Sequence, residues 1–517
     1  MTEKPASSDD ATATTERPGS PPIGNREVVC LGATLAVALV LRALGLDAGL
    51  WYDEVDTLVH HVRQPVTDLL TTYPSLNHHV LFTLEAKAAI ALFGESAWAL
   101  RLPASIFGVT SIWALWLVAR QVVSVREALL SAVLLAVSYH HIWFSQNARG
   151  YTGLLFWGLI ATYFLLHAAR TGSWWAWTGY ALASALAVYT HLTAAFFVAS
   201  HGVVYLAVLA SRVRAKNRPE RRRPDGFPGF IGARPLYGFA MAGLLAVLFH
   251  APMIPQMLVT FTAIAGPQAA LASASIAEWK SPLWTIQEIW RSLGPVLGVA
   301  LPVLIAVVVL GMANLRGSAL IVPATLLIHI PLTLVVLVAG SFRVWPRYFF
   351  IDIGFICLFL IHGTFTIAAV ASRLAARVRW RADAKVLGTV AATLGIAVSL
   401  VLLPRNYAYP KQDFLGARDY VETHRSDASM VVTLGLATMP YADYYAPQWQ
   451  AVETLEELER LQQNYRQVWL VYAFPAVTER RYNQMMGYVS SNFELIKRFP
   501  GTLGGGEVIV LRSIAQQ

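Results

Sequence analysis

The chain has 517 residues, of which 56% are hydrophobic and only 14% are charged. A soluble protein carries about a quarter charged residues, so this composition excludes an ordinary soluble enzyme and indicates a membrane protein. The formal net charge of +9 does not indicate nucleic-acid binding, because no aromatic and basic recognition motif accompanies it.

The N-terminal segment is rich in Ser, Thr, Pro, Asp and Glu and offers almost nothing to bury, which predicts a disordered cytoplasmic tail over residues 1–26. The apolar run at 28–46 follows Arg26, as the core of a signal sequence follows its basic flank. No small-residue cleavage site comes after the run, so we expect a retained signal anchor.

Apolar runs recur along most of the chain, and about twenty residues suffice to cross roughly 30 Å of hydrocarbon. Residues 27–404 are therefore predicted to form an all-α polytopic membrane domain with about eleven transmembrane helices. The expected spans lie at 28–46, 99–120, 127–144, 150–169, 174–190, 193–210, 236–255, 293–313, 318–340, 347–370 and 386–404.

Basic residues in the short loops predict the orientation. With a cytoplasmic N-terminus, nearly all of this charge falls inside, as the positive-inside rule requires. We therefore expect a multi-pass protein of the inner (plasma) membrane whose C-terminal domain is extracytoplasmic. The loops concerned contain Arg120 and Arg126, Arg170, residues 211–235, Arg316 and residues 371–385.

Three regions are expected on the outer side. The loop 47–98 is long and acidic, and its amphipathic stretch 80–93 is too short to span, which predicts a helix in the membrane interface. The second region is 256–292. Residues 405–517 alternate strand-like and helical patterns and are predicted to form a small α/β domain. Every grouping of acids with cations precedes residue 350, so this domain is expected to modulate acceptor binding without carrying a bond-making residue.

The first chemical motif lies at the start of the loop 47–98. Asp53 and Glu54 follow the first span by a few residues, beside Trp51 and Tyr52, which are typical of the headgroup level. A carboxylate pair in this place can act as general base toward a hydroxyl acceptor. The alternative is that the two acids only keep the loop soluble.

Two other external turns combine arginine with aromatic residues. Arg149, followed by Tyr151, is a fixed cation that suits an anionic phosphate, although an arginine can also snorkel to lipid headgroups. Arg343, Arg347 and Tyr348 lie at another external span end, where arginines and rings together can hold a phosphate and a sugar.

Histidines accompany these turns. His191 ends a span on the outer side, and His78 stands next to His79 just before the interfacial stretch. A single interfacial histidine is more often structural, and adjacent histidines in an extended turn point different ways. No metal site is therefore predicted here.

Short motifs at 51–54, 77–82, 92–96, 99–103, 107–109, 145–151 and 345–348 follow one another in a fixed order. This series resembles the GT-C membrane glycosyltransferases, specifically the bacterial family-39 type, with its relatives of the protein O-mannosyltransferases and lipid A aminoarabinose transferases. The resemblance covers roughly residues 28–405 and is strongest over 50–152. In one respect the chain departs from it, because the family often has Glu where Asn147 stands.

The resemblance implies transfer of a sugar from a polyprenyl-phosphate donor to a hydroxyl acceptor (lipid, glycan or protein) at the outer membrane face, with inversion. It makes Asp53 the base, with Glu54 orienting the acceptor and Arg149 and Arg347 holding the phosphate. His78, Tyr151, His191, Arg343 and Tyr348 complete the expected substrate-binding set.

Phosphate is a good leaving group, so cations can replace the general acid that glycoside hydrolysis needs. No cofactor follows from the sequence, and a requirement for a divalent cation is left open. Membrane lipid is expected as a partner and nucleic acid is not. The alternative functions are a transporter or flippase for a lipid-linked sugar, a glycan polymerase or ligase, and a non-catalytic scaffold.

Overall fold

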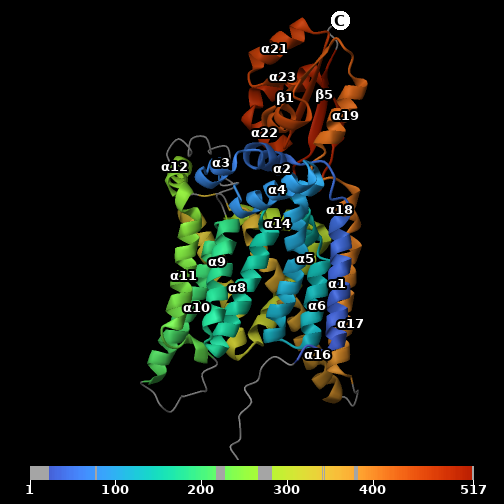
Figure 1. The fold of residues 1–517 in the computed structure, drawn as a ribbon. Coiled ribbons are helices and arrows are strands. Elements are labelled where there is room, and N and C mark those ends of the chain that lie inside the picture. Colours follow the sequence, from blue (N-terminus) through green and yellow to red (C-terminus); the bar gives the residue numbers. More distant parts are fainter. Residues whose placement is uncertain are drawn as a thin grey trace, which may run out of the picture.

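Long apolar helices form a bundle that carries a smaller α/β domain at one end (Figure 1). The computed structural model describes residues 22–75, 78–216, 227–265, 282–340, 342, 344–377 and 382–514. The bundle consists of α1 (Asn25–Ala43), α5 (Ala97–Val122), α6 (Val125–Ala136), α7 (Tyr139–Ser145), α8 (Tyr151–Thr171), α9 (Trp174–Thr190), α10 (Ala194–Lys216), α11 (Arg234–His250), α12 (Ile254–Ala265), α14 (Pro282–Ala313), α15 (Ile321–Ala339), α16 (Ile353–Arg377) and α17 (Ala384–Leu402).

All eleven expected spans fall on helical backbone. Within the described ranges, seven helices are long and apolar enough to cross a membrane, and an eighth is gained if α6 and α7, bent by 59°, count as one broken span. The multi-pass membrane architecture is therefore confirmed, whereas the number eleven stays a prediction. The expected tail 1–26 lies largely outside the described residues, and α1 already begins at Asn25.

Local sequence explains where several helices begin and end. The Ser96 hydroxyl accepts a hydrogen bond from the Ala99 amide at the start of α5. Ser124 and Glu127 form a reciprocal capping box at the start of α6. Helix α8 ends at Gly172, whose φ of +65° is the left-handed conformation that glycine adopts most easily.

The two ends of the bundle differ. The C-terminal end of α10, the start of α11 and the start of α17 lie at the end opposite to the C-terminal domain (Figure 1). The described helix ends that flank the basic loops 211–235 and 371–385 therefore lie on the opposite side from that domain. This arrangement agrees with the predicted alternation, while the identity of each side stays a prediction.

Short helices cover the end of the bundle that faces the C-terminal domain (Figure 1). The predicted interfacial helix is confirmed as a helix over the same residues, with Leu92 and Phe93 exposed at its end. This layer contains α2 (Tyr52–Asp56), the π-helix η1 (Thr57–Val62), α3 (Val66–Thr71), α4 (Val80–Phe93) and the 3₁₀ segment η7 (Pro346–Asp352).

The C-terminal domain contains one five-stranded mixed sheet in the order β2-β1-β3-β5-β4. Strand β1 pairs in parallel with β2 and β3, whereas β5 pairs antiparallel with β3 and β4. The predicted α/β character is confirmed. The elements are α18 (Pro404–Ala408), α19 (Phe414–His424), β1 (Ser429–Leu434), α20 (Thr438–Pro440), β2 (Gln450–Val452), α21 (Leu455–Asn464), β3 (Gln467–Ala473), α22 (Pro475–Arg481), α23 (Asn483–Asn492), β4 (Phe493–Phe499) and β5 (Val508–Ser513).

One apolar cluster crosses from the loop 47–98 into the C-terminal domain. On the loop side it contains Leu50, Val55 and Phe82, and on the domain side it contains Phe414 and Tyr441. The two parts are thus packed against each other. This packing is stabilising because it removes apolar surface of both parts from water.

Candidate active site

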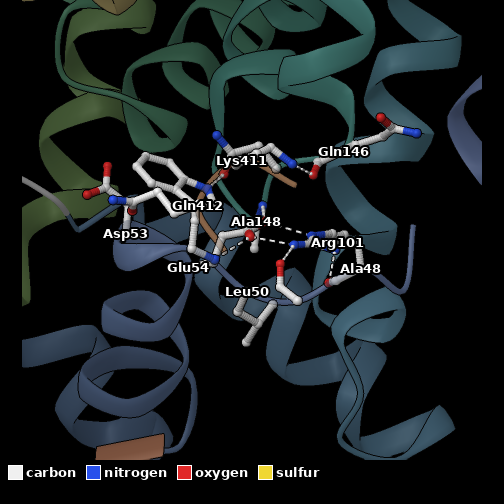
Figure 2. Close-up of polar contacts among 12 residues, drawn as sticks. Ala48, Leu50, Asp53, Glu54, Arg101, Gln146, Ala148, Lys411 and Gln412 are labelled. Carbon is white, nitrogen blue, oxygen red and sulfur yellow. Dashed lines mark hydrogen bonds and ion pairs between the residues drawn. The ribbon is translucent and has the colours of Figure 1, made fainter. Parts of the chain in front are cut away.

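Helix α2 places two adjacent carboxylates on different sides. Successive residues of a helix point about 100° apart, so Asp53 and Glu54 cannot face the same group. Figure 2 shows the two side chains pointing apart, with Glu54 directed toward Arg101. Each carboxylate therefore needs its own description.

Asp53 faces Arg347 across the top of the bundle. The Arg347 Nη1 donates to Asp53 Oδ2 at 3.0 Å, which joins α2 to η7 across 294 residues of sequence. The side chains are 11% and 25% exposed for Asp53 and Arg347, so the pair stays accessible to a ligand. The guanidinium also lies over the Trp345 ring at 4.7 Å, which orients it by a cation–π contact.

Glu54 is fully buried and fully bonded (Figure 2). Its Oε1 accepts from Arg101 Nε and from the Ala148 amide, both at 2.7 Å. Its Oε2 accepts from Arg101 Nη2 at 2.5 Å and from the Trp51 amide at 3.3 Å. Burial opposes ionisation, but the Arg101 charge, Lys411 and these hydrogen bonds together hold the pKa of Glu54 below its usual value.

These contacts bear on the expected role of Glu54. Arg101 also donates to the carbonyls of Leu46, Ala48 and Gly49, so the ion pair ties the start of the loop to α5. Both carboxylate oxygens are occupied inside the protein. Orientation of an acceptor by Glu54 stays a prediction, and its contacts favour a positioning role for it.

Arg149 is buried beside His79. The Gly150 amide donates to His79 Nδ1 at 2.9 Å, and Arg149 Nη2 lies 3.1 Å from His79 Nε2. Burial, followed by the charges of Arg149 and other neighbours, holds the pKa of His79 well below its usual value, so the ring is neutral. An N–H group thus faces each ring nitrogen of His79, and a neutral imidazole can accept only one of them, because its other nitrogen carries the proton. The buried guanidinium of Arg149 suits an anionic oxygen as a ligand.

Aromatic side chains pack around the ring of His79 and its neighbour His191. The His191 ring lies 4.6 Å from the His79 ring, 5.5 Å from Tyr151 and 5.7 Å from Tyr348. Burial lowers the pKa of His191 to about 3, assisted by the charges of Arg149 and Arg347, so it too is neutral. The expected residues Tyr151, His191 and Tyr348 are therefore brought together.

The Asp53–Arg347 pair lies close to Arg149 and its neighbouring rings. The charges of both Arg149 and Arg347 act on His79 and His191, and Arg149 Nη1 is 3.4 Å from the Thr57 hydroxyl, which donates to the Asp53 carbonyl. A carboxylate, two guanidiniums and several rings thus converge at one end of the bundle. Such a site can hold a phosphate and place a base beside it.

Other expected residues are placed differently or lie outside the described ranges. His78 stacks on His61, with ring centroids 4.5 Å apart, and its role in substrate binding stays a prediction. Arg343 falls outside the residues that the structure describes. Asn147, where the family often has Glu, accepts a hydrogen bond from Trp51 Nε1 at 3.1 Å and so supports the loop.

Sequence reasoning did not assign roles to His79 and Arg101. The signal for Arg101 was a charged residue within an apolar helix, which is costly unless it is paired. The signal for His79 was only its neighbour His78. No group of three or more His, Cys, Asp or Glu side chains gathers as a metal site in the described part of the chain, and a divalent cation requirement stays open.

Comparisons with known proteins find a family match over one segment of the chain and a similar overall fold. The family described as dolichyl-phosphate-mannose-protein mannosyltransferase matches residues 78–219. The crystal structure of ArnT from Cupriavidus metallidurans bound to undecaprenyl phosphate is similar over 95% of this chain and 98% of that chain, with 13% identity and a TM-score of 0.51. A search of curated protein sequences gives no significant match.

Weaker similarity extends to other solved structures. The archaeal oligosaccharyltransferase AglB from Archaeoglobus fulgidus, in complex with an inhibitory peptide and a dolichol-phosphate, is covered over 73% of its length by 91% of this chain, with 11% identity and a TM-score of 0.49. The S. cerevisiae protein O-mannosyltransferase Pmt1-Pmt2 complex is covered over 34% by 46% of this chain, with 14% identity and a TM-score of 0.34. The resemblance to GT-C proteins is confirmed in the ArnT-like fold and in the matched segment.

Proposed function

We propose that this chain is a GT-C-type glycosyltransferase, which moves a sugar from a polyprenyl-phosphate donor to a hydroxyl acceptor at the outer face of the inner membrane. The observation that carries the proposal is the accessible Asp53–Arg347 pair, which lies beside the buried guanidinium of Arg149. The ArnT-like fold and the partial match to a mannosyltransferase family support it.

In the proposed reaction, the donor phosphate binds between Arg149, His79 and Arg347. Phosphate competes with Asp53 for the Arg347 guanidinium and so frees the carboxylate, which then accepts the proton of the acceptor hydroxyl. The hydroxyl oxygen forms a bond to the anomeric carbon while the bond from that carbon to the phosphate oxygen breaks. The bonding electrons leave with the polyprenyl phosphate, whose charge the two arginines stabilise.

The site has no need of a general acid, in contrast to the site of a glycoside hydrolase. A phosphate leaving group needs no proton, so one base and two cations are sufficient for the chemistry. The neutral rings of His191, Tyr151 and Tyr348 add a wall on which a sugar can stack. The donor sugar and the acceptor are left for experiment.

The test uses purified protein, a panel of polyprenyl-phosphate sugars and mass spectrometry of the released polyprenyl phosphate. With a suitable acceptor, wild type should release it, and Asp53→Asn should lower turnover by about 10²–10⁴-fold, the usual contribution of a general base. Asp56→Asn is the matched control, because Asp56 lies on the same helix and pairs with His60 instead. Normal turnover in Asp53→Asn would refute this mechanism.

The same panel separates the alternatives. A transporter or scaffold would release no polyprenyl phosphate with any donor and would tolerate Asp53→Asn. A polymerase or ligase would release it only when the acceptor is itself a glycan on a lipid.

A further inference from the structure

The segment that connects the bundle to the C-terminal domain passes directly beside the candidate active site. Lys411 and Gln412 lie next to Glu54, Ala148 and Gln146 (Figure 2). A domain that only modulates acceptor binding from a distance would be expected on an exposed linker. Here the linker carries the fully buried side chain of Gln412.

Gln412 bridges the catalytic helix and the C-terminal domain. Its Oε1 accepts a hydrogen bond from the Tyr52 amide at 3.1 Å, at the first residue of α2. Its Nε2 donates to the Gly506 carbonyl at 2.7 Å, in the loop before β5. One side chain therefore fixes the start of the helix that carries Asp53 to the far end of the chain.

A second bridge reaches the turn that carries Arg149. The Lys411 amine donates to the Gln146 carbonyl and lies 5.4 Å from the centre of the Trp143 ring. Trp143 Nε1 in turn donates to the Thr502 hydroxyl of the C-terminal domain at 2.9 Å. The domain thus holds α7 and the following turn from two directions.

A third contact comes from the domain proper. The Tyr445 hydroxyl donates to the Leu50 carbonyl at 2.8 Å, three residues before Asp53. The apolar cluster of Leu50 and Val55 with Phe414 and Tyr441 surrounds this bond. These contacts involve the segments of both Asp53 and Arg149, which lie far apart in the sequence.

We propose that the C-terminal domain is a structural part of the active site, in which Lys411, Gln412 and Tyr445 are positioning residues that hold the Asp53 helix and the Arg149 turn in register. This role rests on the proposed transferase function. None of the three side chains needs to touch the substrate. Catalysis depends on geometry steeply enough that a displacement of about 1 Å can cost on the order of 100-fold in rate.

Variants that break single contacts test the proposal. Tyr445→Phe removes only the bond to Leu50, and Tyr488→Phe is its matched control, because Tyr488 makes one bond to Gln462 inside the same domain. Gln412→Leu removes the stronger bridge. Deuterium exchange of the peptide 50–57 measures how firmly the backbone around Asp53 is held. The kcat and the donor KM measure how loss of that order affects catalysis and donor binding.

In Gln412→Leu, exchange of the peptide 50–57 should rise, and kcat should fall by about 10- to 100-fold with donor KM changed less than about threefold. Tyr445→Phe should show the same pattern more weakly, and Tyr488→Phe should show neither change. Unchanged exchange in both Gln412→Leu and Tyr445→Phe would overturn the proposal. So would faster exchange with normal kcat.

The two readouts also separate this proposal from the function on which it rests. If wild type releases no polyprenyl phosphate from any donor, the transferase function fails. The exchange measurement then still decides whether the domain holds the loop, because it does not depend on turnover. A rise in all three variants, Tyr488→Phe included, would show general loosening of the domain and would overturn a specific positioning role.

Discussion

Two ion pairs on one helical turn have opposite surroundings. Asp53 and Arg347 meet at a partly exposed rim, through one bond of 3.0 Å. Glu54 and Arg101 meet in the interior, where the side chains are at most 1% exposed and four hydrogen bonds saturate the carboxylate. The first arrangement can exchange its partner for a ligand, and the second cannot do so without breaking the loop. Both pairs carry the same charges, so it is their accessibility that makes Asp53 the candidate base and Glu54 a positioning residue.

The largest expected effect is on stability, in the interior pair. Glu54→Gln should lower the free energy of unfolding by about 3–5 kcal/mol, because Arg101 would be left buried without its countercharge. Thermal unfolding in detergent measures this. The control is Glu95→Gln, whose pair with Arg63 is about 40% exposed on both sides and should contribute below about 1 kcal/mol. Equal melting temperatures for wild type and Glu54→Gln would contradict the comparison.

The next effect concerns donor binding at the candidate active site. Arg347→Met and Arg149→Met should each weaken binding of polyprenyl phosphate by about 10- to 100-fold, as expected for loss of a charge-assisted hydrogen bond of ~1.5–3 kcal/mol. Binding of a fluorescent polyprenyl phosphate provides the measurement. Arg63→Met, which removes an exposed arginine of the loop 47–98, should leave the affinity unchanged. Normal affinity in both variants would show that Arg347 and Arg149 do not bind the donor phosphate.

A smaller effect is predicted for pH, through Lys411 beside the interior pair. Burial lowers the pKa of its amine to about 7, against the opposing charge of Glu54 and with the help of Arg101. Between this value and the ordinary lysine value, the unfolded chain binds more protons than the folded one, so stability rises with pH. From pH 7 to pH 9 the gain from this group should be about 2 kcal/mol.

The matched variant for this pH effect is Lys411→Met, which keeps the length of the side chain without its charge. Its melting temperature should rise less than that of wild type over the same pH range. The difference between the two curves isolates Lys411 from other groups that titrate there. Parallel curves would show that the amine is not held in this low-pKa environment.

The smallest expected effect sharpens the contrast between the two pairs. Asp53→Asn, which should lower turnover by about 10²–10⁴-fold, should lower the free energy of unfolding by much less than Glu54→Gln does, because Arg347 is 25% exposed and keeps its contact with Trp345. Calorimetry of the inactive variant against wild type measures this. A loss as large as that of Glu54→Gln would mean that the rim pair is also part of the support.

Local sequence determined much of the architecture. Hydropathy placed helices at every expected span, and amphipathic periodicity placed α4 at Val80–Phe93. Alternating patterns also predicted the mixed α/β character of the C-terminal domain. These features follow from signals within one element, because an apolar run or a repeat of side chains needs no information about distant residues.

The sequence predicted the candidate residues of the site but not their surroundings. Acidic and basic residues beside aromatics marked Asp53, Arg149 and Arg347 as candidates, and the structure brings them together. The different surroundings of Asp53 and Glu54 were not visible, because neighbouring residues on a short helix face different partners. The choice of His79 over His78 at Arg149 likewise depends on how one turn is packed.

The sequence by itself therefore determined a multi-pass helical bundle, a small α/β domain and the residue types of the candidate site. Only the tertiary structure decided which carboxylate is accessible and which is locked to Arg101. It also decided that Gln412 holds the first residue of the Asp53 helix across 360 positions of sequence. The physical reason is that burial and pairing belong to the packed chain, where contacts between distant segments set the surroundings of each charge.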